Sequence, residues 1–298
     1  LLLLFTSLDL VWNMSTQAKL FIVATPIGNL DDFSFRAIEV LKAVDLVAAE
    51  DTRHSKRLLQ HYQIDTSLIS YHDHSDLSET LKLIELLEAG KSIALISDAG
   101  TPLISDPGYR LVTEARSKGI PVLPIPGASA LTAALSVSGL PTDRFSFEGF
   151  LPAKQVARVK RLQLLEVDSR TLVFYESPHR ILVSLSDMNS VFGDSRKAFI
   201  GRELTKKFES HFLGSLQECV HWVRSDGNNQ KGEFVVVVAG NDDAKDEDLK
   251  LKQAMTIVQS LGKELSMKKA VALASEITGT RKNLLYSKAL EELDSDSK

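Results

Sequence analysis

The sequence predicts an α/β fold made of two consecutive domains with mainly parallel sheets, followed by a small helical region. Short apolar runs rich in β-branched residues alternate with stretches of helical periodicity, which is typical of strands joined by crossover helices. This alternation occurs in two successive sets, and an acidic, polar segment then precedes a helical tail. The 298 residues are enough for two ordinary domains and an appendage.

The first domain is expected over 19–126, after an N-terminal extension at 1–18. The apolar runs predict strands at 19–25, 45–49, 67–72, 92–97 and 120–125, and helices at 33–43, 52–61, 77–89 and 107–118. Asp31 or Asp32 is placed to cap the first of these helices, and Pro107 fits the first turn of the last. Strands separated by helices favour a parallel sheet with right-handed crossovers.

The second domain is expected over 127–240. The same criteria predict strands at 144–150, 171–177, 197–204 and 232–240, and helices at 128–137, 155–167, 178–188 and 215–224. Residues 241–250 form an acidic linker and 251–298 a helical tail. Within the tail, a helix from 267 to about 277, a turn at 278–280 and a second helix from 281 resemble a helix-turn-helix. Contact with nucleic acid and plain packing are equally weighted interpretations of this tail.

Composition bounds the compartment and the partners. Cys219 is the one cysteine, so an intrachain disulfide is excluded and a reducing, cytoplasmic location is expected. No membrane span is expected, because the longest uncharged run, 119–142, is interrupted by prolines. The apolar start LLLLFTSL has no preceding basic residue and fails as a signal peptide. We expect the biological start at Met14, with 1–13 an artefact of gene prediction and a short anchor as the alternative.

The charge is uneven along the chain. The formal net charge of −4 gives no global nucleic-acid signature. Residues 1–150, however, carry a net charge of −6, from 12 basic and 18 acidic side chains, whereas residues 151–240 carry +3, from 13 basic and 10 acidic. Either this is ordinary fluctuation or the second domain meets an anion.

Loops that follow the predicted strands are the candidate site, because ligands of open α/β sheets lie beyond the carboxyl ends of the strands. DAGTPLISDPG (98–108) is the most informative loop, because its glycines and prolines make it too specialised for a generic connection. It lacks both the phosphate-loop ending and the dinucleotide fingerprint. No motif indicates a metal site or a serine nucleophile, and a surface or core role is favoured for the histidines at 54, 61, 72 and 74.

Several motifs together resemble the tetrapyrrole methylase superfamily. They are TPIGNLDD, AEDTR, SDAGTPLISDPG, PGASA, FYESPHR, RELTK and KGEFVVVV, spread from Lys19 to Gly240. The resemblance implies a methyltransferase that holds S-adenosylmethionine (SAM) between two α/β domains. TPIGN stands where porphyrin-type relatives have G-x-G-P-G, which argues against a tetrapyrrole substrate. The resemblance of the whole motif set implies methylation of the ribose 2′-oxygen of a cytidine in the decoding region of 16S rRNA.

The resemblance also implies a set of SAM-binding residues. They are Pro26, Gly28, Gly100, Thr101, Leu103, Ile104, Ser129, Ala130, Tyr175, Glu176, Gly232 and Phe234. Relatives have a carboxylate at the position of Thr101, and Asp98 is the residue expected to take over its charge. The family also implies a homodimer.

A ribose hydroxyl is a poor nucleophile, so a general base or a cation that favours the alkoxide should assist the reaction. The candidate bases are Asp51, Asp98 and Glu176, and Arg53 or Lys231 is suited to hold negative charge. For Asp51 a helix cap or loop ion pair is an equally weighted interpretation.

Basic residues of the second half are expected to contact 16S rRNA or the small ribosomal subunit. They are Lys154, Arg158, Arg161, Lys206, Lys207, Lys268, Lys269, Arg281 and Lys282. The first three recur at helical spacing and are predicted to share one face.

Three alternative functions stay open. One is methylation of a tetrapyrrole or of a modified protein side chain, which does not need a basic tail. Another is a DNA-binding regulator that senses SAM, which predicts duplex binding without turnover. A structural assembly protein is the third, and the Gly/Pro-rich loops disfavour it.

Overall fold

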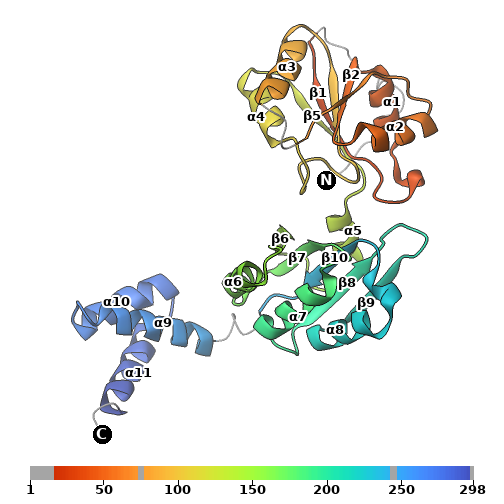
Figure 1. Ribbon diagram of the computed structural model, residues 1–298. Helices are drawn as coiled ribbons and strands as arrows, with labels where there is room; N and C mark the ends of the chain where they lie inside the picture. Colours follow the sequence, from red (N-terminus) through yellow and green to blue (C-terminus); the bar gives the residue numbers. More distant parts are fainter. Residues whose placement is uncertain (1–16, 73–76, 242–246, 296–298) are drawn as a thin grey trace, which may run out of the picture. The chain divides into compact units, whose positions relative to one another are not determined.

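The computed structural model describes residues 17–72, 77–241 and 247–295 (Figure 1). The expected extension at 1–18 lies largely outside the described residues, and so does part of the acidic linker at 242–246. Contacts divide the chain into two compact units. The first comprises the chain up to Val137 together with Arg202–Ser210, and the second comprises Ser138–Gly201 and His211 onward.

The first unit contains a parallel sheet whose strand order is β3-β2-β4-β1-β5. Its strands are β1 (Leu20–Val23), β2 (Leu46–Ala49), β3 (Leu68–Ser70), β4 (Ile93–Ile96) and β5 (Val122–Ile125). β1 pairs in parallel with both β4 and β5, in the registers Leu20↔Ile93 and Leu20↔Val122. All four residues of β4 are buried, as a continuous apolar run in a parallel sheet predicts.

Helices cover both faces of this sheet (Figure 1). They are α1 (Phe35–Ala43), α2 (Thr52–His61), α3 (Leu77–Glu88) and α4 (Tyr109–Ser117), with a 3-10 turn η1 (Leu30–Asp32) before α1, and α5 (Ala130–Val137) follows β5. α1 and α2 pack on Phe21, Val23 and Ile96, whereas α3 and α4 pack on Leu20, Ile93 and Leu95. The two cores contain residues of opposite parity along each strand, so both sheet faces are buried.

Two details of the predicted helix starts are wrong. Ser34 caps α1, because its hydroxyl accepts a hydrogen bond from the Ala37 N–H at 3.1 Å, and Asp31 and Asp32 belong to η1 instead. α4 begins at Tyr109 rather than at Pro107. Gly108 delays it with φ at 135°, a conformation that excludes the helix and favours glycine.

The second unit contains a mixed sheet with the order β6-β7-β10-β8-β9. Its strands are β6 (Phe145–Phe150), β7 (Thr171–Glu176), β8 (Lys197–Arg202), β9 (Ser210–Ser215) and β10 (Phe234–Val238). β6 runs parallel to β7, but β10 runs antiparallel to it, so this sheet departs from the expected parallel arrangement. The edge strand β9 was not predicted, since its short sequence SHFLGS includes a glycine and has no apolar run.

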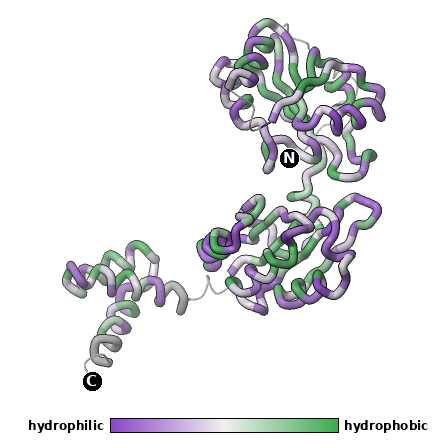
Figure 2. The backbone as a smooth tube through the Cα atoms, viewed as in Figure 1, coloured by the Kyte–Doolittle hydropathy of each residue, from purple (hydrophilic) through white to green (hydrophobic). Residues whose placement is uncertain are grey.

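Helices α6 (Gln155–Leu165), α7 (Ile181–Phe192) and α8 (Leu216–Ser225) cover one face of this sheet. Their core includes Leu162, Leu185 and Cys219 packed on Phe174 and Val236. Figure 2 shows hydrophobic residues concentrated in the strands of both units, with hydrophilic residues on the helices and loops.

The tail consists of α9 (Glu247–Leu261), α10 (Met267–Thr278) and α11 (Lys282–Ser295). Its core is built from all three helices, including Val258, Val271 and Leu285. Gly279 takes the left-handed conformation between α10 and α11, which confirms the predicted helix, glycine-containing turn and helix. In the described part of the chain, no helix is both long and apolar enough to cross a membrane.

Candidate functional site

The loops after β4, β1 and β5 meet at one edge of the first sheet, because these strands are neighbours in the order β4-β1-β5. Thr25 and Gly100 exchange backbone hydrogen bonds of 2.8 and 3.1 Å, which join the loop after β1 to the loop after β4. The hydroxyl of Thr101 donates to the carbonyl of Ala128 at 3.0 Å, which joins the loop after β5. The chain therefore brings together, in three joined loops of the first unit, the eight predicted SAM-binding positions from Pro26 to Ala130.

The loop after β4 holds an uncommon backbone. Leu103 and Ser105 have φ values of 72° and 67°, in the left-handed region that non-glycine residues rarely adopt, and Gly100 has φ at 90°. Each such non-glycine residue costs on the order of 1–3 kcal/mol, and this strain typically marks ligand clamps and active sites. Buried hydroxyls hold the loop in place: Thr25 donates to the carbonyl of Ser97 at 3.1 Å, and Ser97 donates to that of Gly100 at 3.3 Å.

The loop between β8 and β9 reaches the loop after β1 within the same unit. A Cβ atom added at position 28 would overlap the side-chain stem of Lys206. Any residue larger than glycine at this position would therefore have to displace the lysine. The Lys206 ammonium lies 3.0 Å from a carboxylate oxygen of Glu203. Glu203 and Thr205 both have positive φ, so this second loop is also strained.

Two of the candidate bases are linked at this edge. The backbone N–H of Asp51 donates to the carboxylate of Asp98 at 3.0 Å, which fixes Asp98 beside the loop after β2. Asp51 itself caps α2 by accepting the Arg53 N–H at 2.8 Å. That hydrogen bond, followed by one from the Arg53 side chain, lowers the pKa of the Asp51 carboxyl. Asp51 is therefore a weaker base than an ordinary aspartate, and its role as a helix cap is realised. The side chain of Arg53 is 90% exposed.

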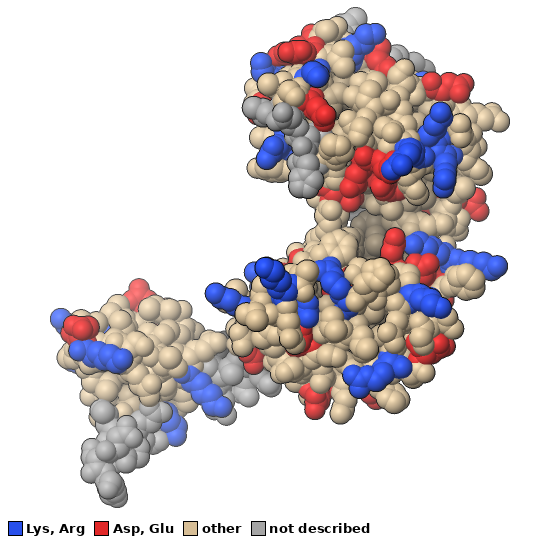
Figure 3. All heavy atoms as spheres, viewed as in Figure 1, with Lys and Arg blue, Asp and Glu red and all other residues tan. Residues whose placement is uncertain are grey.

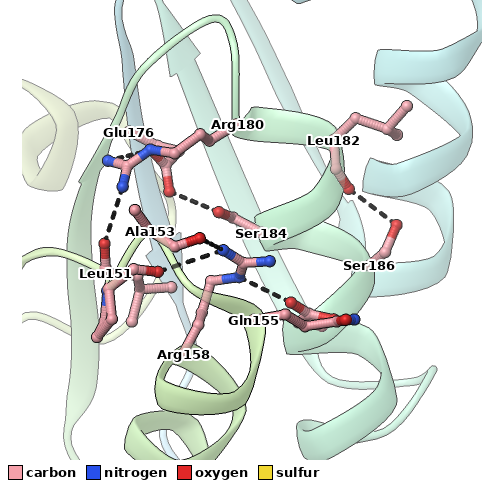
Figure 4. A network of polar contacts seen from close by, with 11 residues as sticks. Leu151, Ala153, Gln155, Arg158, Glu176, Arg180, Leu182, Ser184 and Ser186 are labelled. Carbon is pink, nitrogen blue, oxygen red and sulfur yellow. Dashed lines mark hydrogen bonds and ion pairs between the residues drawn. The ribbon is translucent and has the colours of Figure 1, made fainter.

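Glu176 is enclosed by partners from the start of α7. One carboxylate oxygen accepts the Ser177 N–H at 2.8 Å and lies 3.0 Å from the Arg180 guanidinium, and the other accepts the Ser184 hydroxyl at 2.6 Å. The side chain is 1% exposed, and both oxygens point into the network of Figure 4. These contacts disfavour the predicted role of this carboxylate as a base, because it is buried and holds the start of α7 in place.

The other predicted second-unit positions lie at the ends of β7 and β10. Tyr175 is half-buried and packs against Phe147, with ring centroids 4.8 Å apart. Gly232 has φ at 91° just before β10. Phe234 is buried in the helix-covered core, so only its backbone is available to a ligand. Lys231 is exposed, and its ammonium donates to the side-chain oxygen of Asn228 at 3.1 Å.

Arg158 does not share an exposed face with its basic neighbours, which corrects the prediction. Its side chain is 4% exposed, lies 2.7 Å from the carboxylate of Asp187, and donates to backbone carbonyls of the segment 152–153. Lys154 and Arg161 are exposed, and Arg161 lies 2.6 Å from Glu148. Basic side chains gather around α6 on the face of the second unit in Figure 3.

The remaining predicted basic residues lie on surfaces. Lys207 is exposed and lies 5.5 Å from the ring centroid of Phe208. The four predicted cations of the tail are exposed, two in the first turn of α10 and two just after the turn between α10 and α11. They are Lys268, Lys269, Arg281 and Lys282.

Residues 19–220 match the family described as Tetrapyrrole (Corrin/Porphyrin) Methylases, which is more than half of the chain. The chain belongs to this family. Solved structures agree at the level of the fold. A uroporphyrin-III-C-methyltransferase from Thermus thermophilus superposes with a TM-score of 0.54 at 19% identity, covering 75% of this chain and 94% of that one. A diphthine synthase superposes with a TM-score of 0.56 at 17% identity, covering 74% and 90%.

Closer relatives carry one common name. Ribosomal RNA small subunit methyltransferase I of Pseudomonas aeruginosa is 56% identical over 276 residues, covering 93% of this chain and 98% of the relative. The protein of that name from Escherichia coli O157:H7 is 51% identical over 278 residues, covering 93% and 96%. Residues 248–293 also match the family described as RsmI C-terminal HTH domain, which agrees with the helix-turn-helix predicted for the tail.

Proposed function

We propose that this protein transfers a methyl group from SAM to the ribose 2′-oxygen of a cytidine in the decoding region of 16S rRNA. The observation that carries the proposal is the 56% identity, over nearly the full length of both chains, to a small-subunit rRNA methyltransferase. A substrate in the ribosome is consistent with a cytoplasmic location, and a homodimer is part of the proposal on grounds of family resemblance alone.

The residues at the three joined loops fit SAM. Leu103, Ile104, Ser129 and Ala130 are half-buried, which provides the mainly apolar surface with a few hydroxyls that a nucleoside requires. SAM supplies a methyl group activated by a positively charged sulfur. The half-buried carboxylate of Asp98 provides a fixed negative charge at the same edge, and it takes the place of the carboxylate that relatives have at Thr101.

The general base and the RNA contacts are assigned to residues of the chain. Of the three predicted bases, Asp98 is retained, because Glu176 is enclosed and Asp51 is a cap with a lowered pKa. The exposed guanidinium of Arg53 is suited to a phosphate of the RNA backbone. Lys154, Arg161, Lys207 and the cations of the tail extend this contact over the basic surfaces of the chain.

A direct test uses the full chain, SAM labelled in its methyl group, and purified small ribosomal subunits. The label should appear on one cytidine of 16S rRNA, and hydrolysis should recover it as a 2′-O-methyl nucleoside. Free 16S rRNA, intact subunits and a tetrapyrrole are supplied in parallel. If the label appeared in a nucleobase, in a ribosomal protein or in the tetrapyrrole, the ribose 2′-oxygen would not be the methyl acceptor and the proposal would be wrong.

A further inference from the structure

The edge strand β6 contains a bulge next to the end of β7. Phe147 pairs with Val173 and Phe150 pairs with Tyr175, so three positions along β6 span two along β7. Glu148 is the extra residue, and the register shifts between Phe147 and Gly149. A bulge of this kind changes which face the following side chains occupy.

The shift places two phenylalanines on one face of the sheet. Without it, Phe147 and Phe150 would point to opposite faces, because their separation is odd. Instead, both rings contact Tyr175, with centroid distances of 4.8 Å for Phe147 and 5.8 Å for Phe150. We name Phe147, Phe150 and Tyr175 the aromatic platform. Phe174, the neighbour of Tyr175, belongs to the core under α6–α8, so the platform lies on the other sheet face.

Phe150 is the accessible member of the platform. It is 52% exposed although it is a large aromatic residue at the end of a strand. Two exposed cations lie on or beside the helix that follows it: Lys154 precedes α6 four residues after Phe150, and Arg161 of α6 forms an ion pair with Glu148 of the bulge. An exposed aromatic face followed along the chain by exposed cations is the combination of side chains that binds single-stranded nucleic acid.

The segment that follows Phe150 is held rigidly (Figure 4). Arg180 donates to the carbonyl of Leu151 at 3.1 Å while its guanidinium pairs with Glu176. Arg158 donates to the carbonyls of residues 152 and 153 at 3.2 and 2.9 Å while it pairs with Asp187. Two arginines thus bind three consecutive carbonyls, which fixes the positions of Phe150 and Lys154 before any ligand arrives. Such preorganisation lowers the entropy lost on binding.

From this arrangement we propose that Phe150, the exposed ring of the aromatic platform, stacks an unstacked base of the RNA substrate, with Lys154 binding an adjacent phosphate. This proposal rests on the proposed function and deepens it by naming the surface that holds a base. An enzyme that reaches a ribose within a folded RNA displaces the nucleotide or its neighbour from its stack, and an exposed aromatic surface compensates for that loss. Arg158 and Arg180 act here as positioning residues.

The test uses the full chain and a short single-stranded RNA carrying pyrrolocytidine, whose fluorescence falls when the base stacks. Phe150→Leu removes the π face, keeps an apolar side chain and should weaken binding about tenfold or more, with the quenching lost. Phe150→Tyr should restore both. Phe145→Leu is the matched control, because Phe145 lies at the opposite end of the same strand and is 43% exposed.

Salt dependence separates the two parts of the proposed contact. Stacking releases no counterions, so Phe150→Leu should leave the slope of log affinity against log salt unchanged. Lys154→Gln should make that slope shallower by about 0.7, the value for one phosphate contact of a single strand.

Three outcomes would overturn the proposal. The first is wild-type affinity in Phe150→Leu. The second is an equal loss in Phe145→Leu. The third is a Phe150→Leu variant that changes its oligomeric state in sedimentation while RNA binding is kept, because the platform would then contact a second copy of the chain. Methylation of small subunits by the wild type is measured alongside. If it is absent while the base still stacks, the proposed function fails and the platform stands.

Discussion

At the scale of single residues, partners from distant parts of the chain decide what a charged side chain does. Arg158 and Arg161 are three positions apart on one helix, yet one is buried against Asp187 and the other is exposed. Helical spacing placed both on a basic face, but it contains no information about a carboxylate 29 residues away. Glu176 differs, because its partners are local: Arg180 is four residues away and Ser184 is on the next helix, eight residues away.

The buried pair gives the first prediction. Arg158→Leu leaves the carboxylate of Asp187 buried without its cation, and breaking a buried pair in this way typically costs about 3–5 kcal/mol. We expect a loss of that size in the free energy of unfolding, measured in urea. Arg161→Gln, which alters an exposed arginine on the same helix, should change it by less than about 0.5 kcal/mol. Equal stability of the two variants would show that the Arg158 pair contributes nothing.

Cys219 gives the second prediction. Burial raises the pKa of its thiol to about 12 from a value of 9.0, so the thiol stays neutral in the folded chain. As the pH rises, the thiol ionises in the unfolded chain before it ionises in the folded chain. The stability that this group contributes is therefore complete below pH 9.0 and declines as the pH rises toward about 12. At pH 8 a disulfide reagent should modify native protein slowly and urea-unfolded protein rapidly. A cysteine placed at exposed Ser225, in a Cys219→Ala background, should react rapidly in both states.

At the scale of elements, the sequence predicts those that have a strong local pattern. α2 runs over Thr52–His61 as expected, and β4 lies within its predicted run, because periodicity and apolar length alone specify them. β9 was not predicted, because this edge strand forms through pairing with its neighbour β8 and its own sequence has no strong strand pattern. The three loops of the candidate site were predicted from their Gly/Pro content and from their places after strands. The contact of a fourth loop, the one between β8 and β9 that contains Lys206, with Gly28 was not predicted. Its contact joins positions far apart in sequence.

That contact between two loops gives the third prediction. Gly28→Ala should force the Lys206 stem away and lower both stability and the affinity for SAM, whereas adding Lys206→Ala should recover most of the loss by making room. Directly contacting residues typically show an interaction energy of about 0.5–3 kcal/mol in such a double-mutant cycle. Urea unfolding and calorimetric titration with SAM measure the two quantities. Lys207→Ala, one residue further on and exposed, should rescue neither, and additive effects at 28 and 206 would contradict the contact.

At the scale of the whole molecule, SAM binding is expected to need the α/β units alone, whereas RNA binding is expected to need the tail as well. The predicted SAM loops belong to strand ends of the α/β units, whereas the tail closes a core of its own from α9, α10 and α11. Of the four predicted RNA-binding cations at its surface, Arg281 and Lys282 follow the turn between α10 and α11, and the other two, Lys268 and Lys269, lie in the first turn of α10.

Removal of the tail tests that division. A chain that ends at Gly240 lacks Lys268, Lys269, Arg281 and Lys282 but retains every predicted SAM-binding residue. We expect its affinity for SAM, measured by calorimetry, to stay within a few-fold of the full chain, and methylation of small subunits to fall sharply. Replacing the four cations by Gln in the full chain is the matched variant, because it leaves the tail core intact and removes only charge. The same loss in both variants, relieved at low salt in the second, would assign the effect to phosphate contacts. Normal methylation by the shortened chain would instead make the tail a packing element.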